Sequence, residues 1–131
     1  MVIVMKKDCL FCQIANKEAE SFILYEDNDL IVILDAYPDA DGHTLIIPKK
    51  HYEDIYEVPD ELLVKMFSKA KEMTHKLMDK LKKDAITYVI NYGDAQVIKH
   101  FHLHLIPNYI KKEHNLSKEE VYKLLNEDNN D

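Results

Sequence analysis

The chain has 131 residues, of which 47% are hydrophobic and 31% charged, and its formal net charge at pH 7 is −7. This size and composition predict one globular domain over residues 1–131. The negative charge argues against a nucleic-acid binder, which needs a concentrated basic surface. No segment has the roughly 20 apolar residues of a membrane helix, and MVIVMKK at the start lacks the order of a secretory signal. We therefore expect a cytoplasmic protein without a membrane partner.

Short elements fill the first part of the chain. A short helix is expected to begin near Cys9 and to run through Ala15, with Asp8 as its cap. Alternating and continuous apolar runs then predict three strands, at 22–26, 30–34 and 43–47. The second of these strands is apolar enough to be buried on both faces. A polar loop with a proline and a glycine, DAYPDADG, separates it from the third.

A long helix and two more strands follow. Apolar residues recur at steps of three and four from Pro59 to Leu81, which predicts an amphipathic helix packed on a sheet. Strands are expected at 86–91 and across the histidine-rich segment that ends at Pro107. Ser117 begins a capping-box pattern for a helix through about Leu125, and the tail after it is expected to fray. This order predicts an α+β fold with an antiparallel sheet.

The segment KHFHLHLIP, residues 99–107, places three of the seven histidines at alternate positions. Because side chains in a strand alternate between faces, His100, His102 and His104 share one face and the apolar residues between them share the other. A solvated edge strand would not favour histidine. Alternating histidines can instead bind a metal, or provide a nucleophile and an acid near neutral pH. Both uses are compatible.

The only cysteines form a CxxC pair, Cys9 and Cys12. Two thiolates at this spacing suit a tetrahedral zinc ion, which needs two further ligands. His51 and one end of the histidine triad are the candidates. A redox-active pair is the alternative, but it is typical of a thioredoxin-like βαβ context that this order of elements lacks. Zinc is therefore the preferred interpretation.

Taken together, these motifs resemble the histidine triad (HIT) superfamily of nucleotide hydrolases and transferases. The string HFHLHLI fits the His-x-His-x-His-x-x pattern, and CLFCQIANKE, LYEDNDLIVILDAYPDADGHTLIIPKKHY and NYGDAQVIKHFHLHLIP match HIT elements in the expected order. The resemblance covers a core of residues 8–109 and leaves the C-terminal helix and tail, 110–131, unmatched. It implies an α+β fold with about five antiparallel strands, one long helix and short terminal helices. It also implies a homodimer.

The resemblance implies specific chemistry for the triad. In HIT proteins the residue that matches His102 attacks the α-phosphate of a nucleotide and forms a covalent nucleotidyl-histidine intermediate. His104 would donate to phosphate oxygens or to the leaving group. Release by water or another acceptor would give a nucleoside monophosphate. In the zinc-bearing branch of the family, the ligands of a structural zinc ion resemble Cys9, Cys12, His51 and His100.

The resemblance also implies a site for a purine nucleotide. Asp35 matches the acid that binds the ribose hydroxyls, although an aspartate here could instead start a turn. His43 resembles a fourth histidine near the phosphate, where a structural hydrogen bond is the alternative role. Positions that sandwich the base match Leu10, Phe11, Ile14 and Ile33. Amides that contact the phosphates match Asn91 and Gln96.

One loop departs from the family pattern. Between Asn91 and His100 the chain is two residues shorter than usual, and Val97 stands where a serine or threonine is common. A valine has no hydroxyl to donate to a phosphate. The sequence therefore predicts a nucleotide hydrolase or nucleotidyl transferase, with a zinc-stabilised nucleotide-binding or interaction protein of little turnover as the alternative. It does not identify the leaving group.

Overall fold

The computed structural model describes residues 8–108 and 115–127. Predictions for the first seven residues, and for the tail from residue 128, fall outside these ranges. In chain order the elements are α1 (Leu10–Ala15), β1 (Ile23–Glu26), β2 (Leu30–Leu34), β3 (Thr44–Pro48), the 3-10 turn η1 (Ile55–Glu57), α2 (Asp60–Leu81), β4 (Ile86–Val89), the 3-10 turn η2 (Gly93–Ala95), β5 (Leu103–Pro107) and α3 (Lys118–Leu125).

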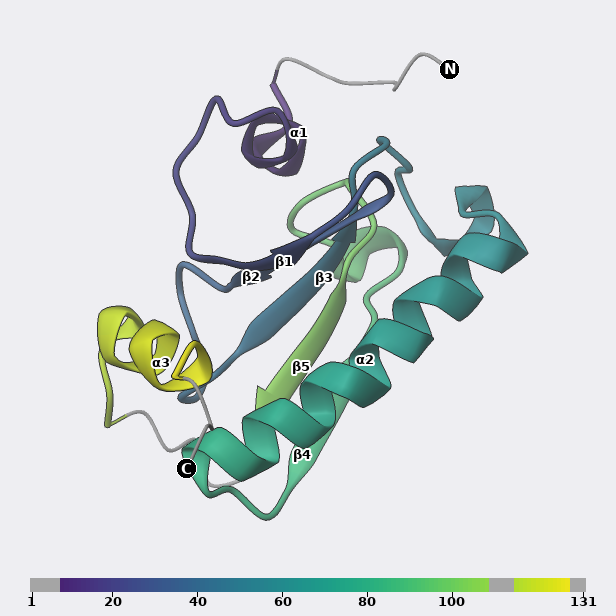
Figure 1. Ribbon diagram of the computed structural model, residues 1–131. Helices are drawn as coiled ribbons and strands as arrows, with labels where there is room; N and C mark the ends of the chain where they lie inside the picture. Colours follow the sequence, from purple (N-terminus) through teal and green to yellow (C-terminus); the bar gives the residue numbers. More distant parts are fainter. Residues whose placement is uncertain (1–7, 109–114, 128–131) are drawn as a thin grey trace.

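The five strands form one antiparallel sheet in the order β1-β2-β3-β5-β4 (Figure 1). The last strand in sequence therefore lies inside the sheet, between β3 and β4. Its register places His104 opposite Leu45 of β3 and Val89 of β4. The predicted α+β fold with five antiparallel strands and one long helix is confirmed.

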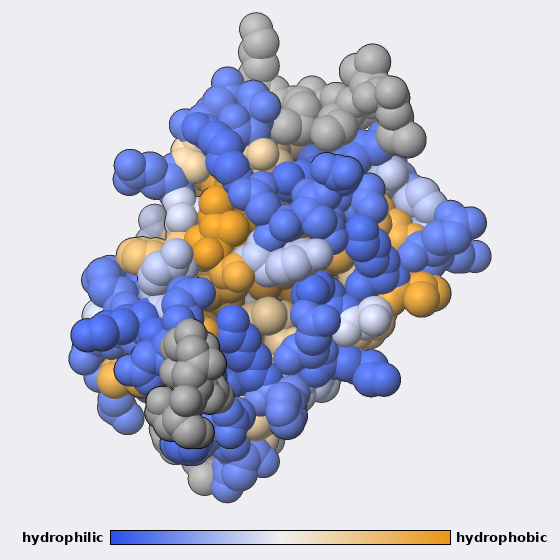
Figure 2. Space-filling model, in the orientation of Figure 1, coloured by the Kyte–Doolittle hydropathy of each residue, from blue (hydrophilic) through white to orange (hydrophobic). Residues whose placement is uncertain are grey.

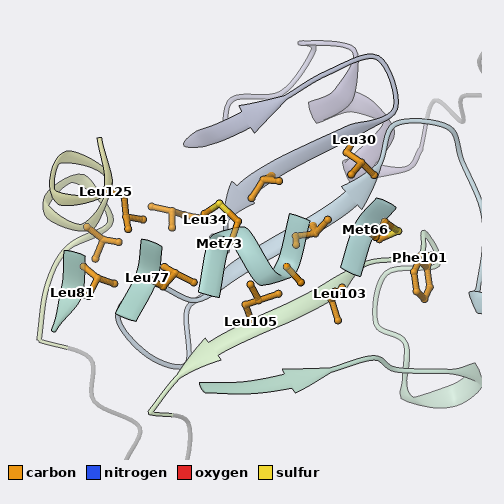
Figure 3. Close-up of a cluster of buried hydrophobic side chains, with 14 of the residues drawn as sticks. Leu30, Leu34, Met66, Met73, Leu77, Leu81, Phe101, Leu103, Leu105 and Leu125 are labelled. Atoms are coloured by element: carbon orange, nitrogen blue, oxygen red, sulfur yellow. The ribbon is translucent and has the colours of Figure 1, made fainter. Parts of the chain in front are cut away.

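α2 covers one face of the sheet. The helix buries a row of side chains at three- and four-residue steps from Met66 to Leu81, as the amphipathic pattern predicts. This row packs against alternate strand residues such as Leu34 and Leu105, and α3 extends the same apolar core (Figure 3). Each fully buried leucine of this kind contributes about 1.5–3 kcal/mol by removal from water. This face is stabilised by apolar burial.

α1 covers the opposite face with a smaller apolar cluster. The strand residues in this cluster alternate along β2 and β3 with those of the α2 face, and the rest come from α1 and its N-cap. The members are Cys9, Phe11, Cys12, Ile14, Ile31, Ile33, Leu45 and Ile47. The N-cap of α1 is Cys9, whose Sγ accepts a hydrogen bond from the Cys12 N–H at 3.4 Å. The prediction of Asp8 as the cap is wrong because the helix begins at Leu10, one residue later than expected.

β5 is shorter than the predicted histidine strand. It begins at Leu103, so only His104 of the triad lies within it. The segment before it is extended but pairs with the chain that follows β3: the Phe101 N–H donates to the main-chain oxygen of Tyr52 at 2.7 Å. The predicted separation of faces still holds, because Phe101 and Leu103 belong to the α2-face core.

The outer surface is mostly polar. Figure 2 shows hydrophilic residues over most of the face with α2, and apolar residues near the first turns of that helix, where Val64 is 69% and Phe67 45% exposed. Among the described residues, no helix combines the length and the apolar character that crossing a membrane requires.

Candidate active site and metal centre

Four potential zinc ligands converge beneath α1, as the sequence predicts. Cys9 and Cys12 come from the start of α1, His51 follows β3, and His100 precedes β5. The Sγ of Cys9 lies 3.3 Å from Nδ1 of His100, and the Sγ of Cys12 lies 3.3 Å from Nδ1 of His51 and 3.5 Å from Nδ1 of His100. A tetrahedral zinc ion with its usual bond lengths separates sulfur and nitrogen ligands by about 3.5 Å. The four residues therefore fit a zinc ion.

The ring of His100 is oriented for metal binding. Its Nε2–H donates to the main-chain oxygen of Pro48 at 2.8 Å, and a carbonyl can only accept, so the lone pair lies on Nδ1. Burial lowers the pKa of His100 to about 4, which keeps the ring neutral. A hydrogen bond from the distal nitrogen is the usual way in which proteins orient a histidine ligand. These contacts favour zinc over a redox pair.

His102 has the tautomer that a nucleophile needs. Its Nδ1–H donates to the main-chain oxygen of His100 at 2.7 Å, which leaves the lone pair on Nε2. The side chain is 8% exposed, and burial lowers its pKa below the ordinary value. The ring of Phe11 packs against it edge-on, with the centroids 4.9 Å apart. His102 is therefore a neutral imidazole held in one orientation.

His104 is the end of a short hydrogen-bonded chain. The Asp39 N–H donates to Nδ1 of His43 at 3.0 Å, so the proton of His43 lies on Nε2. That Nε2 lies 2.9 Å from Nδ1 of His104 and 3.3 Å from Oδ2 of Asp35. Because His104 accepts at Nδ1, its own proton lies on Nε2. Its ring centroid lies 4.7 Å from that of His102, so the two rings are neighbours on the same side of the sheet.

Burial keeps His43 and His104 neutral. It lowers the pKa of His43 by more than the negative charges of Asp35 and Asp39 raise it, and it lowers the pKa of His104 to about 3. Asp35, His43 and His104 are close enough to suggest a second metal site. The hydrogen bonds argue against one, because a metal on Nε2 of His43 would require a proton on Nδ1, where the Asp39 N–H already points.

Asp35 serves the turn that the sequence left as an alternative. Its Oδ1 accepts from the Tyr37 N–H at 2.9 Å, and its Oδ2 faces His43. The carboxylate is partly exposed, at 18% of the side chain, so it remains open to a ligand. A turn role and a binding role are compatible in this geometry.

The structure divides the four predicted base-contacting residues. Leu10 is 44% exposed, whereas Phe11, Ile14 and Ile33 are buried in the apolar cluster beneath α1. Leu10 is thus the member of this group with the most surface to offer a base. The other three form a buried apolar wall, and Phe11 of this wall packs edge-on against His100 and His102.

The two predicted phosphate-contacting amides lie on the loop between β4 and β5. Asn91 is half-buried just beyond β4. Gln96 is buried, and its Nε2–H donates to the main-chain oxygen of Glu53 at 2.8 Å. Val97, the residue without a hydroxyl, is 96% exposed. The Lys99 ammonium donates to the Gly93 oxygen at 2.6 Å and closes this loop.

Sequence reasoning did not predict two pairings in the site. The hydrogen bond between His43 and His104 depends on the register of β3 with β5, and the contact of Phe11 with His102 depends on how α1 docks. The position of His43 just before β3 was the available signal for the first pairing. No local sequence pattern predicts the contact of Phe11 with His102.

Comparisons with known proteins agree with this geometry. A family profile described as "HIT domain" matches residues 16–111. An uncharacterised HIT-like protein of Mycoplasma genitalium is 38% identical over 93% of this chain and 94% of its own length. Adenylylsulfatase HINT3 of Arabidopsis thaliana is 38% identical over 79% of this chain and 53% of its own length.

A solved structure extends the agreement to three dimensions. The crystal structure of a zinc-bound histidine triad family protein from Mycobacterium smegmatis superposes with a TM-score of 0.82 at 34% identity, over 90% of each chain. With its triad and its two-cysteine, two-histidine cluster, the chain belongs to the histidine triad (HIT) family of nucleotide-binding proteins and hydrolases, in the branch with a CxxC zinc site.

Proposed function

We propose that this protein hydrolyses or transfers a nucleotidyl group from substrates of the form nucleoside-phosphate-X, where X is an amine, a phosphate chain or another acyl or sugar-phosphate group. The observation that carries the proposal is the orientation of His102. Its Nδ1–H is held by the oxygen of His100, so the Nε2 lone pair is available to attack phosphorus. The ring of His104, whose proton lies on Nε2, packs against the ring of His102 with the centroids 4.7 Å apart.

The reaction has two displacements. Nε2 of His102 forms a bond to the α-phosphorus as the bond from phosphorus to X breaks, and Nε2–H of His104 stabilises the phosphate oxygens or protonates X. His43 holds His104 in the tautomer that this step requires. Water, or another acceptor, then attacks phosphorus, the bond to His102 breaks, and the nucleoside monophosphate or its transfer product leaves.

Zinc has a structural role in this proposal. Bound by Cys9, Cys12, His51 and His100, it would have four protein ligands and no open position. It would tie α1 to the segment that carries His102. A cytoplasmic location suits this role, because reducing conditions keep both cysteines as thiols.

The nucleoside would lie over the α1 side of the site. Asp35 would accept hydrogen bonds from the ribose hydroxyls, and Leu10 would pack on a purine base against the wall formed by Phe11, Ile14 and Ile33. Asn91 and Gln96 would contact the phosphates, the latter through the second hydrogen of its side-chain amide, since the first is bonded to Glu53.

We further propose that two copies form a homodimer through the β4 edge and the outer side of α2. β4 is an edge strand, and Val64, Phe67 and Tyr88 expose apolar surface beside it. Sedimentation analysis should give twice the mass of one chain. Phe67→Glu should give monomers, whereas Tyr37→Glu, at an exposed residue on the loop before β3, should not.

The second candidate is a zinc-stabilised nucleotide-binding or interaction protein with little turnover. The loop between β4 and β5 favours it, because Val97 has no hydroxyl for a phosphate and Gln96 commits one of its two amide hydrogens to Glu53. The two candidates differ in whether a covalent intermediate forms.

Intact-mass analysis after an acid-free quench separates the candidates. The panel contains an adenosine phosphoramidate, a dinucleoside polyphosphate and their guanosine equivalents. A nucleotidyl adduct on the wild type that His102→Ala loses and His75→Ala retains would support covalent catalysis, since His75 is exposed on α2. No adduct and no released monophosphate from the folded zinc-bound protein would favour the binding role.

A further inference from the structure

We propose that Asp41 is a positioning residue that fastens the C-terminal segment to the loop carrying Asp35 and His43, and that this contact sets the preference for a ribose over a deoxyribose. Residues 35–43 are called the substrate loop below. The inference rests on the proposed function, in which Asp35 binds the ribose. It adds a residue, and a part of the chain, outside the triad and the zinc cluster.

Both carboxylate oxygens of Asp41 bind the C-terminal segment. Oδ2 accepts from the Asn115 N–H at 3.1 Å, and Oδ1 accepts from the Leu116 N–H at 2.9 Å. The side chain is 2% exposed. A buried carboxylate needs such partners, and hydrogen bonds to a charged acceptor are among the strong ones. The contact joins residues that lie 74 and 75 positions apart in the chain.

The C-terminal segment is a firm support for this contact. A capping box between Ser117 and Glu120 begins α3, and Val121 and Leu125 are buried in the core with α2. Lys118, in the first turn of α3, donates to the main-chain oxygen of Ala36 at 3.2 Å. The substrate loop is therefore held at two points, at Asp41 by the residues just before α3 and at Ala36 by the first residue of α3.

Main-chain hydrogen bonds within the substrate loop connect Asp41 to Asp35 and His43. The Asp35 N–H donates to the His43 oxygen at 2.9 Å, and the His43 N–H donates to the Ala40 oxygen at 3.1 Å. Gly42, at φ +87°, packs against Leu77, where a Cβ would meet the Leu77 side chain at 3.3 Å. Asp41 therefore lies in a short closed loop whose two ends are the proposed ribose ligand and the partner of His104.

Loss of the Asp41 contacts should affect ribose binding and phosphate binding differently. The triad is held mainly by β5 and the His100 oxygen, so the nucleophile keeps its orientation. The backbone of Asp35 continues from β2, but in the described part of the chain the hydrogen-bond and ion-pair partners of its carboxylate, Tyr37 and His43, both belong to the loop. Loss of the Asp41 contacts should therefore weaken the hydrogen bond to a ribose hydroxyl more than it weakens the binding of phosphate.

The test compares binding of adenosine monophosphate and 2′-deoxyadenosine monophosphate to the full zinc-bound chain by calorimetry. Asp41→Asn keeps the shape but turns an N–H₂ toward one of the two donors. We expect it to reduce the ribose preference, the ratio of the two Kd values, by about tenfold relative to wild type. Asp35→Asn should give a similar loss and serves as the reference.

Asp60→Asn is the matched control. It makes the same change at an exposed carboxylate in the first turn of α2, at the other end of the helix from Leu77 and Leu81, which contact Gly42, so it should leave the ratio unchanged. A reduced ratio in Asp41→Asn alongside an unchanged ratio in Asp60→Asn supports the inference. Equal losses for both nucleotides, or a wild type without a ribose preference, overturn it. Because binding is measured without turnover, a missing covalent adduct would count only against the proposed function.

Discussion

The two faces of the sheet are built on different principles. The α2 face is an apolar core of leucines, methionines and valines that spans the length of the helix. The α1 face has a small apolar cluster, and beside it lie the histidines, the cysteines and Asp35. The first face gains stability from burial alone. The second uses hydrogen bonds, and in our proposal a zinc ion, to hold polar groups in place.

This difference shows how one strand can serve two purposes. In the histidine segment, odd positions such as Phe101 and Leu103 belong to the α2 core, and even positions carry the histidines to which we assign the chemistry. The apolar half supplies the rigidity that a catalytic geometry needs. Substitutions on the two faces should therefore have separable consequences.

The largest expected effect is loss of chemistry without loss of fold. His102→Ala should lower turnover of the best nucleotide donor by at least about 1,000-fold, because it removes the attacking nitrogen. Its free energy of unfolding should stay within about 1 kcal/mol of wild type. Kinetics and urea unfolding measure the two quantities. Turnover within tenfold of wild type would exclude His102 as the nucleophile.

Removing zinc should weaken the α1 face. Chelation of the metal should lower the free energy of unfolding by about 3–5 kcal/mol. This is the scale expected when the Kd of a ligand lies far below its free concentration. Cys12→Ala should lower zinc content and stability together. His75→Ala, which changes an exposed histidine, should alter neither. Metal analysis and thermal unfolding provide the readouts, and an unchanged zinc content in Cys12→Ala would contradict the assigned ligand set.

A cavity on the α2 face should lower stability while leaving turnover and zinc content nearly unchanged. Leu77 is fully buried, so Leu77→Ala should cost about 2–5 kcal/mol of stability. Turnover per folded molecule, and zinc content, should remain within threefold of wild type well below the melting temperature. Urea unfolding and steady-state kinetics on the same sample make the comparison. A loss of zinc in this variant would show that the two faces are coupled.

The smallest expected effect is a dependence of stability on pH. Burial holds the pKa of His104 at about 3, below the ordinary value near 6.5, so between these values the unfolded chain binds the extra proton. Stability should therefore fall as pH drops from 7 to 5.5, by about 1 kcal/mol from this residue. Urea unfolding at both pH values should show a smaller fall in His104→Gln. An equal fall in both proteins would show that His104 does not contribute.

Local patterns predicted much of the fold. The apolar run from Leu30 to Leu34 reads as a strand buried on both faces, and every residue in it is buried. The spacing in α2 and the capping box at Ser117 were equally clear, because each depends on residues within one or two turns. The alternation around His102 correctly separated the two faces of its segment.

Features that depend on distant partners escaped sequence reasoning. β5 starts late because Phe101 pairs with Tyr52 and not with β3. Gln96 was assigned to phosphate from its place in the pattern, and its bond to Glu53 needs a contact across 43 residues. Asp41 looked like one of several loop acids, and only the return of the C-terminal segment distinguishes it.

The hydrogen bond between His102 and the oxygen of His100 has a consequence for how mutations can act. Its acceptor belongs to the main chain, so every amino acid at position 100 supplies it. The side chain at the same position is one of the four proposed zinc ligands, which a single codon change can remove. A substitution at position 100 can therefore remove this ligand, while the main-chain oxygen that accepts from Nδ1–H of His102 is still present. Only the position of that oxygen relative to His102 can change.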